Sequence, residues 1–437
     1  MSVFKDLGTW GVAGILLCFT LSAQTPDAAT QQLQQLIDSE QSARQSGDPG
    51  QVIAAAEKLT EAAGQQMTAT TEALKQPHLA PAQSQQLNHR EQQLREVLSN
   101  GFNDWGTAEA RQKEYQQALT HFQQAEKWDA ATPGVMRNLG TAAFLLQDYP
   151  ESVRALTAVV THDANDQRSR LMLAMSFFSM EKFADAAKNF SIIPDTAMHD
   201  TRSAYAWSFS LARTGQDMQA NSIIDNLAAR DLTPDVRMLV CQLYNTTENY
   251  EHAVPCFKKL AEENPTMPRA NFEAGAALVH FDRPADAIPE LRAELKLNPQ
   301  DVDAQYYLAF ALLETSQKDE ALSLLRTVIA EKPDHAQAQY QMGKVLLEDG
   351  KVDEAIPHLE TAAKLDPSSD YIHYQLQAAY RRAGRTADAN RELEIYKQIK
   401  ASHRNTGAPH ESTRPAAPPS DQPVPPATQE PAPRPQP

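Results

Sequence analysis

A repeat of 34 residues is the feature that most constrains how this chain can fold. Alanines recur in one register, with a single interval of 33, at Ala186, Ala220, Ala253, Ala287, Ala321, Ala355 and Ala389, and Ala118 and Ser152 keep the same register earlier in the chain. A second series closes four successive units at Pro265, Pro299, Pro333 and Pro367. A fixed period of this length indicates a stacked array, in which no single unit can bury its apolar face alone.

Each unit also has a fixed internal pattern. In the unit of Ala355, the small residue Gly343 stands twelve positions earlier and the large apolar Leu359 stands four positions later. Apolar residues recur every three or four positions on both sides of a short polar turn, here EDGKVD at residues 348–353. The pattern predicts two antiparallel amphipathic helices per unit, whose backbones cross most closely at the small residues.

The order of small residue, alanine, large apolar residue and proline in units of 34 resembles the tetratricopeptide repeat family. The resemblance covers about residues 99–400 and comprises nine units, although the family's usual tryptophan at the fourth position of the unit is absent throughout. It implies an all-α fold, a right-handed superhelical solenoid of helix-turn-helix units. A low aromatic content of 7% agrees with helices rather than strands.

Three prolines occupy the same position inside the second helix of their units: Pro255, Pro289 and Pro357. A proline there removes one backbone hydrogen bond, which is tolerable where the freed carbonyl meets water. We therefore expect this position to face the outer surface of the array.

The segments on either side of the array have a different character. Residues 1–23 combine a lone Lys5, a short apolar run and a small-residue end at Ala23, the layout of a cleaved signal peptide. Residues 24–98 predict an N-terminal helical cap, with a degenerate hairpin over residues 30–65. Residues 401–437 are rich in proline and predict a disordered tail, which acts either as a plain linker or as a ligand for an aromatic groove.

Composition and motifs exclude several classes of function. A net charge of −16 argues against a nucleic-acid-binding surface, because such affinity depends on Lys and Arg neutralising phosphates. The sequence contains no HExxH, P-loop or GxSxG motif. We therefore expect no enzyme activity, no metal and no cofactor.

The family resemblance implies that first helices line a concave surface that binds a protein or peptide partner. On that basis we predict a partner site that combines an aromatic stripe with a basic C-terminal end: Tyr205, Phe209, Phe272, Tyr306, Phe310, Tyr340, Lys344, Tyr371, Tyr374, Arg381 and Arg382. The alternative is that the tyrosines pack between helices. If they bind a partner, Tyr306→Ala with Tyr340→Ala should weaken capture and leave stability nearly unchanged.

Two cysteines remain after signal cleavage, and both belong to one unit. Cys241 occupies the eighth position and Cys256 the twenty-third. An oxidising compartment would permit a disulfide. Antiparallel pairing sets the eighth position against the twentieth, so we expect buried free thiols instead.

Taken together, these features predict an exported, non-catalytic scaffold that holds a partner protein in its concave groove, in the periplasm or secreted space. The alternative is an accessory subunit of an envelope enzyme such as a peptidoglycan or polysaccharide synthase. No stable membrane insertion is expected after signal cleavage. The partner and the oligomeric state are not defined by the sequence.

Overall fold

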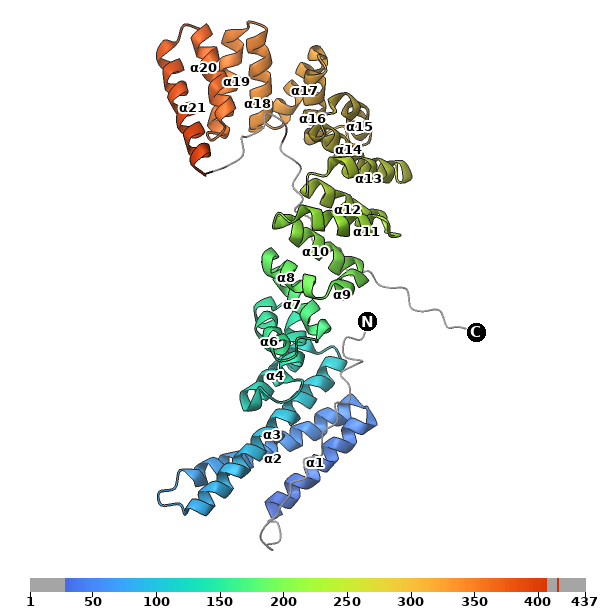
Figure 1. Cartoon of the computed structure of the whole chain (residues 1–437), viewed down its shortest axis with the longest axis vertical. Helices are drawn as coiled ribbons and strands as arrows, with labels where there is room; N and C mark the ends of the chain where they lie inside the picture. Colours follow the sequence, from blue (N-terminus) through green and yellow to red (C-terminus); the bar gives the residue numbers. More distant parts are fainter. Residues whose placement is uncertain (1–27, 407–414, 416–437) are drawn as a thin grey trace, which may run out of the picture. The chain divides into compact units, whose positions relative to one another are not determined.

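The computed structural model describes residues 28–406 and residue 415, and every element in this part of the chain is a helix (Figure 1). The predicted all-α solenoid is confirmed. The predicted signal peptide, residues 1–23, lies outside the described residues, and so does all of the predicted tail except residues 401–406 and 415.

The chain divides into two compact units, Met1–Ser210 and Leu211–Pro437. The helices of the first unit are α1 (Ala28–Ser46), α2 (Pro49–Leu74), α3 (Pro81–Arg111), α4 (Tyr115–Asp129), α5 (Val135–Leu145), α6 (Tyr149–His162), α7 (Gln167–Ser179), α8 (Phe183–Ile192) and α9 (Pro194–His199). The division between the units falls inside α10 (Thr201–Arg213).

The second unit continues the alternation of first and second helices. Its helices are α11 (Asp217–Ala228), α12 (Pro234–Thr246), α13 (Tyr250–Glu263), α14 (Ala270–His280), α15 (Pro284–Leu297), α16 (Val302–Glu314), α17 (Lys318–Glu331), α18 (Ala336–Glu348), α19 (Val352–Leu365), α20 (Asp370–Arg382) and α21 (Thr386–Thr406). Consecutive helices pack as hairpins, for example α14 with α15 and α18 with α19.

The small residues lie where the two helices of a hairpin cross, as predicted. A Cβ atom added to Gly140 would come within 2.7 Å of the Cγ of Leu156, and one added to Gly343 within 2.6 Å of the Cγ of Leu359. Both leucines are fully buried. Glycine is therefore required here for backbone approach, since a larger residue would have to displace the branch point of a core leucine.

The prolines within second helices are exposed, which confirms the expectation for Pro255, Pro289 and Pro357. Helices α13, α15 and α19 continue through them without interruption. On this side of the helix, water can satisfy the carbonyl that proline leaves unpaired.

The N-terminal flank forms a hairpin of α1 and α2. Asp48 caps α2 by accepting a hydrogen bond from the backbone N–H of Gly50 at 2.9 Å, and Pro49 occupies the first turn. Helix α3 then runs through the predicted boundary at residue 98, so the cap and the first repeat share one helix.

Two features of the chain differ from the sequence prediction. The second helix α8 ends early at Ile192, and the short helix α9 follows it within the same 34-residue interval from Ala186 to Ala220. Helix α21 extends to Thr406, so residues 401–406 are helical rather than part of the predicted tail. Its polar sequence lacks a strong apolar period, which is why composition alone placed the end of the helix too early.

At the fourth position of the unit, where the family usually has tryptophan, several repeats of this chain have a polar side chain. Gln305 and Gln339 donate hydrogen bonds to the carbonyls of the prolines six residues earlier, at 2.8 and 3.0 Å, and His373 contacts the equivalent proline carbonyl at 3.1 Å. Arg170 donates a 3.5 Å hydrogen bond to the carbonyl of Ala164, which also lies six residues earlier.

These fourth-position side chains also contact the second helix of their own hairpin. Gln339 accepts a hydrogen bond from His358 at 2.7 Å, and His373 lies 2.7 Å from Glu392. All of the fourth-position residues named are nearly fully buried. Gln339 and His373 thus join the turn between units to the helix pair, a role that replaces the packing of a large indole ring.

Candidate functional site

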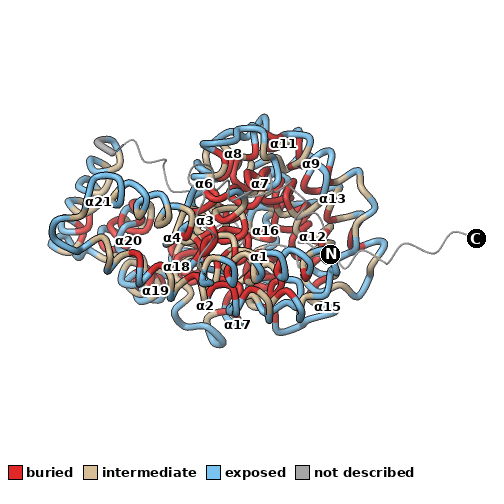
Figure 2. The backbone as a smooth tube through the Cα atoms, turned by 90° about the horizontal axis from the view of Figure 1, so that it is seen from below, coloured by how far each residue is buried: buried red, intermediate tan, exposed pale blue. Residues whose placement is uncertain are grey.

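Most of the predicted aromatic stripe lies inside the helix stack rather than on a free surface. Six of its members are less than 9% exposed: Tyr205, Phe209, Phe272, Tyr306, Phe310 and Tyr340. Buried positions, coloured red in Figure 2, are concentrated in first helices such as α16. Burial also raises the pKa of the Tyr340 hydroxyl, which is consistent with a desolvated ring.

The reason for this burial is contact between neighbouring repeats. The ring of Tyr340 packs edge-on against Tyr371 of the next first helix, with centroids 4.8 Å apart. Tyr306 contacts His335, the residue that caps the next first helix, at 4.5 Å. Removing such a ring should cost about 3 to 5 kcal/mol. Contrary to the expectation from the sequence, we therefore predict that Tyr306→Ala with Tyr340→Ala lowers stability.

The last member of the stripe is the exception. Tyr374 occupies the same register position as Tyr340, but no further repeat follows α20 and α21 in the described chain. Its side chain is 55% exposed and lies 5.6 Å from the ring of Tyr396 on α21. An aromatic surface is thus available at the C-terminal end of the array.

The three predicted cations lie on α18 and α20 and differ in their contacts. Lys344 is half-buried and Arg381 is exposed, and neither forms an ion pair within residues 28–406. Arg382 is engaged: its Nη1 donates a 2.6 Å hydrogen bond to the carbonyl of Leu347 near the end of α18. Arg382 therefore caps a helix C-terminus, where cations are favoured.

Two contacts define how α18 and α20 run beside each other. Tyr340 meets Tyr371 near the start of both helices, and Arg382 meets Leu347 near their ends. Lys344 lies between these contacts on α18, while Tyr371, Tyr374 and Arg381 share one face of α20 at intervals of three and seven residues. We call these four residues, Lys344, Tyr371, Tyr374 and Arg381, the C-terminal strip.

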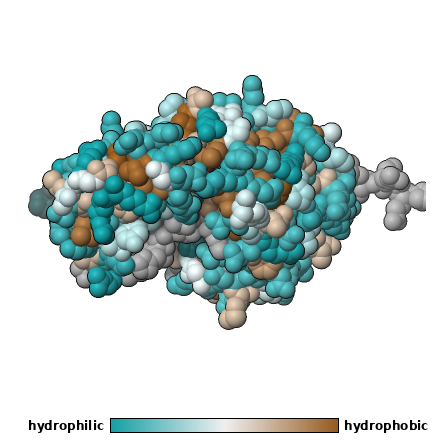
Figure 3. Space-filling view, turned by 90° about the horizontal axis from the view of Figure 1, so that it is seen from above, coloured by the Kyte–Doolittle hydropathy of each residue, from teal (hydrophilic) through white to brown (hydrophobic). Residues whose placement is uncertain are grey.

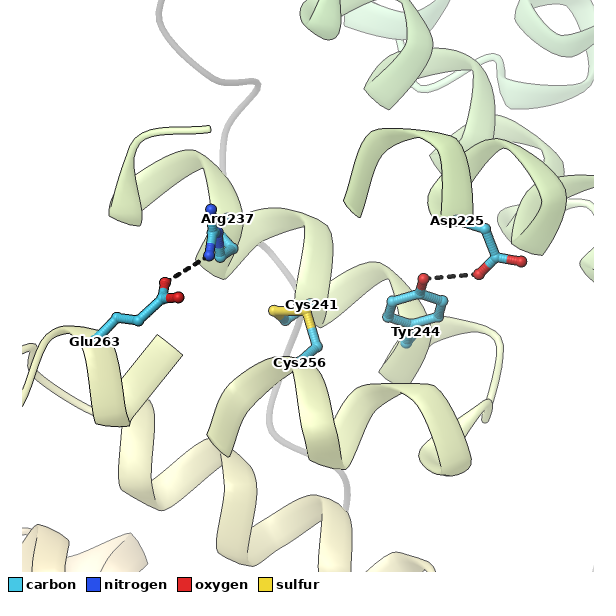
Figure 4. The surroundings of a disulfide bond; sticks show 6 residues. All are labelled: Asp225, Arg237, Cys241, Tyr244, Cys256 and Glu263. Carbon is cyan, nitrogen blue, oxygen red and sulfur yellow. Dashed lines mark hydrogen bonds and ion pairs between the residues drawn. A yellow bond between two sulfur atoms is a disulfide. The ribbon is translucent and has the colours of Figure 1, made fainter. Parts of the chain in front are cut away.

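The two cysteines form a disulfide, so the expectation of free thiols is wrong (Figure 4). Cys241 on α12 and Cys256 on α13 are joined, with Cα atoms 5.6 Å apart. Cys241 occupies the close crossing where other repeats have glycine, so its sulfur reaches the second helix three residues beyond the predicted pairing. The bridge lies in the same hairpin as the 2.7 Å ion pair between Arg237 and Glu263.

The shallow clefts of the described residues include two of about 230 Å³ each. One is lined by residues such as Met342, Leu346 and His358, and the other lies beside Cys256, with Tyr244 among its lining residues. Neither contains a residue of the C-terminal strip, and both are too small to hold a peptide of several residues.

Among the described residues, exposed apolar side chains do not form a second candidate surface. The large ones are Ile192, Met218, Phe281, Leu297, Leu365 and Tyr374, and each comes from a different part of the helix series. The face of the molecule drawn in Figure 3 is mostly hydrophilic, with hydrophobic areas between polar ones. Scattered exposure of this kind is ordinary for a protein surface.

In the described part of the chain, no group of three His, Cys, Asp or Glu side chains is placed to hold a metal ion. Among helices α1 to α21, none has the length and apolarity needed to cross a bilayer.

The fold and the site define an α-solenoid of helical hairpins with a basic, aromatic C-terminal end. Two family models described as tetratricopeptide repeat match the chain, one over residues 278–344 and the other over residues 103–168 and 244–302. The chain is a tetratricopeptide-repeat protein, a class of protein-interaction scaffolds. A model described as bacterial transcriptional activator domain also matches residues 330–406, which correspond to the last helical hairpins.

Several solved structures are similar to parts of the chain. MamA from Desulfovibrio magneticus is 23% identical and covers 40% of this chain and 97% of its own, with a TM-score of 0.35. YrrB, described as a TPR protein with an unusual peptide-binding site, is 20% identical over 39% of this chain and 89% of its own, with a TM-score of 0.34.

A third structure, the C-terminal part of a TPR repeat-containing protein from Cytophaga hutchinsonii, is 16% identical over 55% of this chain and 99% of its own, with a TM-score of 0.43. Because these TM-scores are below 0.5, the likeness assigns neither a function nor a partner to this chain. No curated protein matches the chain.

Proposed function

We propose that this protein is an exported, non-catalytic scaffold that holds an extended, acidic segment of a partner protein against the C-terminal strip. The observation that carries the proposal is the exposure of Tyr374 on the face of α20 that also carries Arg381, with Lys344 on α18, which packs against α20. Neither cation forms an ion pair with another described residue. A tyrosine provides contact area and a polar tip, and the cations provide charge-assisted hydrogen bonds to carboxylates.

The charge balance of the chain supports this choice of ligand. The chain as a whole carries a net charge of −16, so a cationic strip stands out against an acidic background. An acidic partner is repelled by most of the surface and attracted at one end of the array. Attraction at one end and repulsion elsewhere would favour acidic partners and would also fix the orientation in which they bind.

Two features support export. The sequence begins with the three-part pattern of a signal peptide over residues 1–23. The disulfide between Cys241 and Cys256 is typical of proteins in oxidising compartments and rare in reducing ones. Both are consistent with a periplasmic or secreted protein.

The binding proposal is tested by reversing the two cations of the strip. Lys344→Glu with Arg381→Glu should weaken partner binding by about tenfold or more, because hydrogen bonds to charged groups contribute about 1.5 to 3 kcal/mol each. The matched control is Lys296→Glu with Lys364→Glu, which makes the same change in charge on exposed positions of second helices α15 and α19.

The partner itself is identified by a photo-crosslinking residue placed at position 374 of the full chain, in an envelope extract. Binding is then measured by titrating the crosslinked partner. Equal weakening by both double variants would show that only overall charge matters and would refute the strip. If the crosslinked partner is an envelope synthase, the chain is an accessory subunit rather than a structural scaffold.

A further inference from the structure

Helix α21 brings further side chains to the exposed tyrosine of the C-terminal strip. It packs against α20 in the last described hairpin, where Figure 1 shows the two helices side by side. The ring of Tyr396 on α21 lies 5.6 Å from the ring of Tyr374 on α20 and is tilted by 50° to it. Side chains of two helices therefore meet at one place on the surface, although only Tyr374 belongs to the strip.

The position of Tyr396 is closed in earlier repeats. Its equivalents one, two and four repeats earlier are Ala362, Val328 and Leu260, and all three are fully buried. The second helix that carries each of them packs against the first helix of the next repeat, which is α20, α18 or α14. Tyr396 itself is only half-buried, since no first helix follows α21 in the described chain.

The side chain of Lys400 is fixed beside the ring of Tyr396. Its Nζ donates a 2.8 Å hydrogen bond to the Tyr396 hydroxyl and lies 5.2 Å from the centroid of that ring. Lysine side chains are flexible, so these two contacts order the ammonium group before any ligand binds and lower the entropic cost of binding. Lys400 forms no ion pair with another described residue.

Hydrogen-bond donors remain on both of these groups. An ammonium group has three N–H donors, and the Tyr396 hydroxyl accepts only one of those of Lys400. The hydroxyl acts as acceptor in this contact, so its own O–H can still donate. Because the Nζ and Oη atoms are 2.8 Å apart, both can contact the two oxygens of one carboxylate. Hydrogen bonds that involve charged groups are the stronger ones, so the pair is suited to a carboxylate.

The charges around Lys400 also favour an anion. The hydrogen bond to Tyr396 raises the pKa of Lys400, while Asp370 and Arg404 act on that pKa in opposite directions. After Glu394 the described part of α21 contains no carboxylate side chain, but it contains three cations: Lys397, Lys400 and Arg404. This end of the helix therefore attracts negative charge.

Tyr374 adds an apolar surface next to the donors. Its ring is 55% exposed, so an aromatic or aliphatic side chain of a ligand can pack against it. In an extended chain, adjacent side chains point to opposite sides, and residues two apart point to the same side about 7 Å from each other. That spacing is close to the 5.6 Å between the rings of Tyr374 and Tyr396. An extended ligand would therefore use residues two positions apart.

We propose that Tyr374, Tyr396 and Lys400 form a carboxylate cradle, which binds an acidic residue together with an apolar residue two positions away in an extended partner segment. Lys400 and the Tyr396 hydroxyl hold the carboxylate, and Tyr374 holds the apolar side chain. This inference rests on the proposed function and deepens it, because it defines a residue pattern that the partner segment carries.

The test measures binding of labelled peptides to the full chain by fluorescence anisotropy. The matched peptide carries one Asp-Ser-Phe unit in a Gly-Ser background, with a run of Glu residues for the cations of the C-terminal strip. The spacing control rearranges the unit to Ser-Asp-Phe, and the charge control replaces its Asp by Lys. The matched peptide should bind several-fold more tightly than either control. Equal binding of the matched peptide and the charge control would overturn the proposal.

Four variants assign the roles within the cradle. Lys400→Gln should weaken binding of the matched peptide about tenfold, and Tyr396→Phe, which removes only the hydroxyl, several-fold. Tyr374→Ala should abolish the preference for the matched peptide over the spacing control, which a general loss of stability would not do. The matched control is Lys397→Gln, the same change in charge on α21, because the Nζ of Lys397 already pairs with Glu394 at 2.7 Å. It should bind like the original chain.

The outcomes separate the cradle from the proposed function. If Lys344→Glu with Arg381→Glu weakens binding but Lys400→Gln does not, the cradle is refuted and the strip stands. Equal weakening by Lys400→Gln and Lys397→Gln would show an effect of overall charge and would also refute the cradle. If neither Lys400→Gln nor the double reversal changes binding of the matched peptide, the cradle and the proposed function both fail.

Discussion

The close crossing of helices at Gly140 leads to a quantitative prediction. Substituting Gly140→Ala adds one methyl group to α5, and its Cβ would lie 2.7 Å from the Cγ of Leu156 and 3.2 Å from the Cβ of Ala155. Alanine favours a helix over glycine by roughly 0.5 to 1 kcal/mol. Overpacking a filled core costs about 1 to 3 kcal/mol. The net effect should be a destabilisation of about 1 kcal/mol.

The matched control is Gly64→Ala in α2 of the same unit. A Cβ at Gly64 meets no atom within 4 Å, so only the helix propensity changes and the variant should be more stable. The two variants should therefore differ by about 2 kcal/mol, or roughly 4 to 8 °C in the melting temperature of a unit of this size. Thermal unfolding followed by circular dichroism measures the difference.

A double-mutant cycle isolates the contact itself. Leu156→Ala alone should cost about 2 to 5 kcal/mol, because it leaves a cavity in a fully buried site. In that background the clash with the Leu156 side chain is gone and only the 3.2 Å approach to the Cβ of Ala155 remains, so Gly140→Ala should no longer destabilise the chain. If Gly140→Ala already stabilises the unsubstituted chain as much as Gly64→Ala does, the reasoning about close crossing is refuted.

Two further predictions concern stability. Cys241→Ser with Cys256→Ser should lower the unfolding free energy of the second unit by about 3 kcal/mol, since the bridge closes a loop of 15 residues. As a control, a reductant should destabilise the original chain and leave the stability of this variant unchanged. Burial and the nearby Asp104 raise the pKa of Glu40 from 4.5 to about 8, against the opposing charge of Arg44. The folded state therefore holds an extra proton between these values, and the first unit should lose stability as pH rises from 4.5 through 8. Denaturant unfolding across pH should show this loss, and Glu40→Gln should reduce it, since only Asp104, whose pKa burial also raises, then remains at this place.

The repeat explains why so much of the fold was predictable. Each unit must present the same apolar faces to its neighbours, so the helix pair, the close crossing at Gly343 and the exposed Pro357 all recur in fixed register. A single helix of this length would have given a weak signal. The recurrence made helix type and register readable from local spacing, because each contact is made mainly with the adjacent repeat.

The candidate site was only partly predictable. Tyr340 and Tyr374 occupy the same position of their units, so the sequence predicts the same role for both. In the structure Tyr340 packs against the next repeat, whereas Tyr374 lies in the last described repeat and stays exposed. Likewise, Arg382 was predicted as a partner contact, but the neighbouring helix α18 engages it at Leu347.

By itself the sequence determined the helices, their pairing and their register, because these depend on spacing within one repeat and the next. Tertiary structure alone decided which polar groups meet: the bridge between Cys241 and Cys256, and the buried hydrogen bonds of Gln339 and His373 that stand in place of tryptophan. Those contacts depend on the rotation of one helix about another by a fraction of a turn. A periodic pattern of apolar residues does not specify that rotation, whereas close packing of the side chains does.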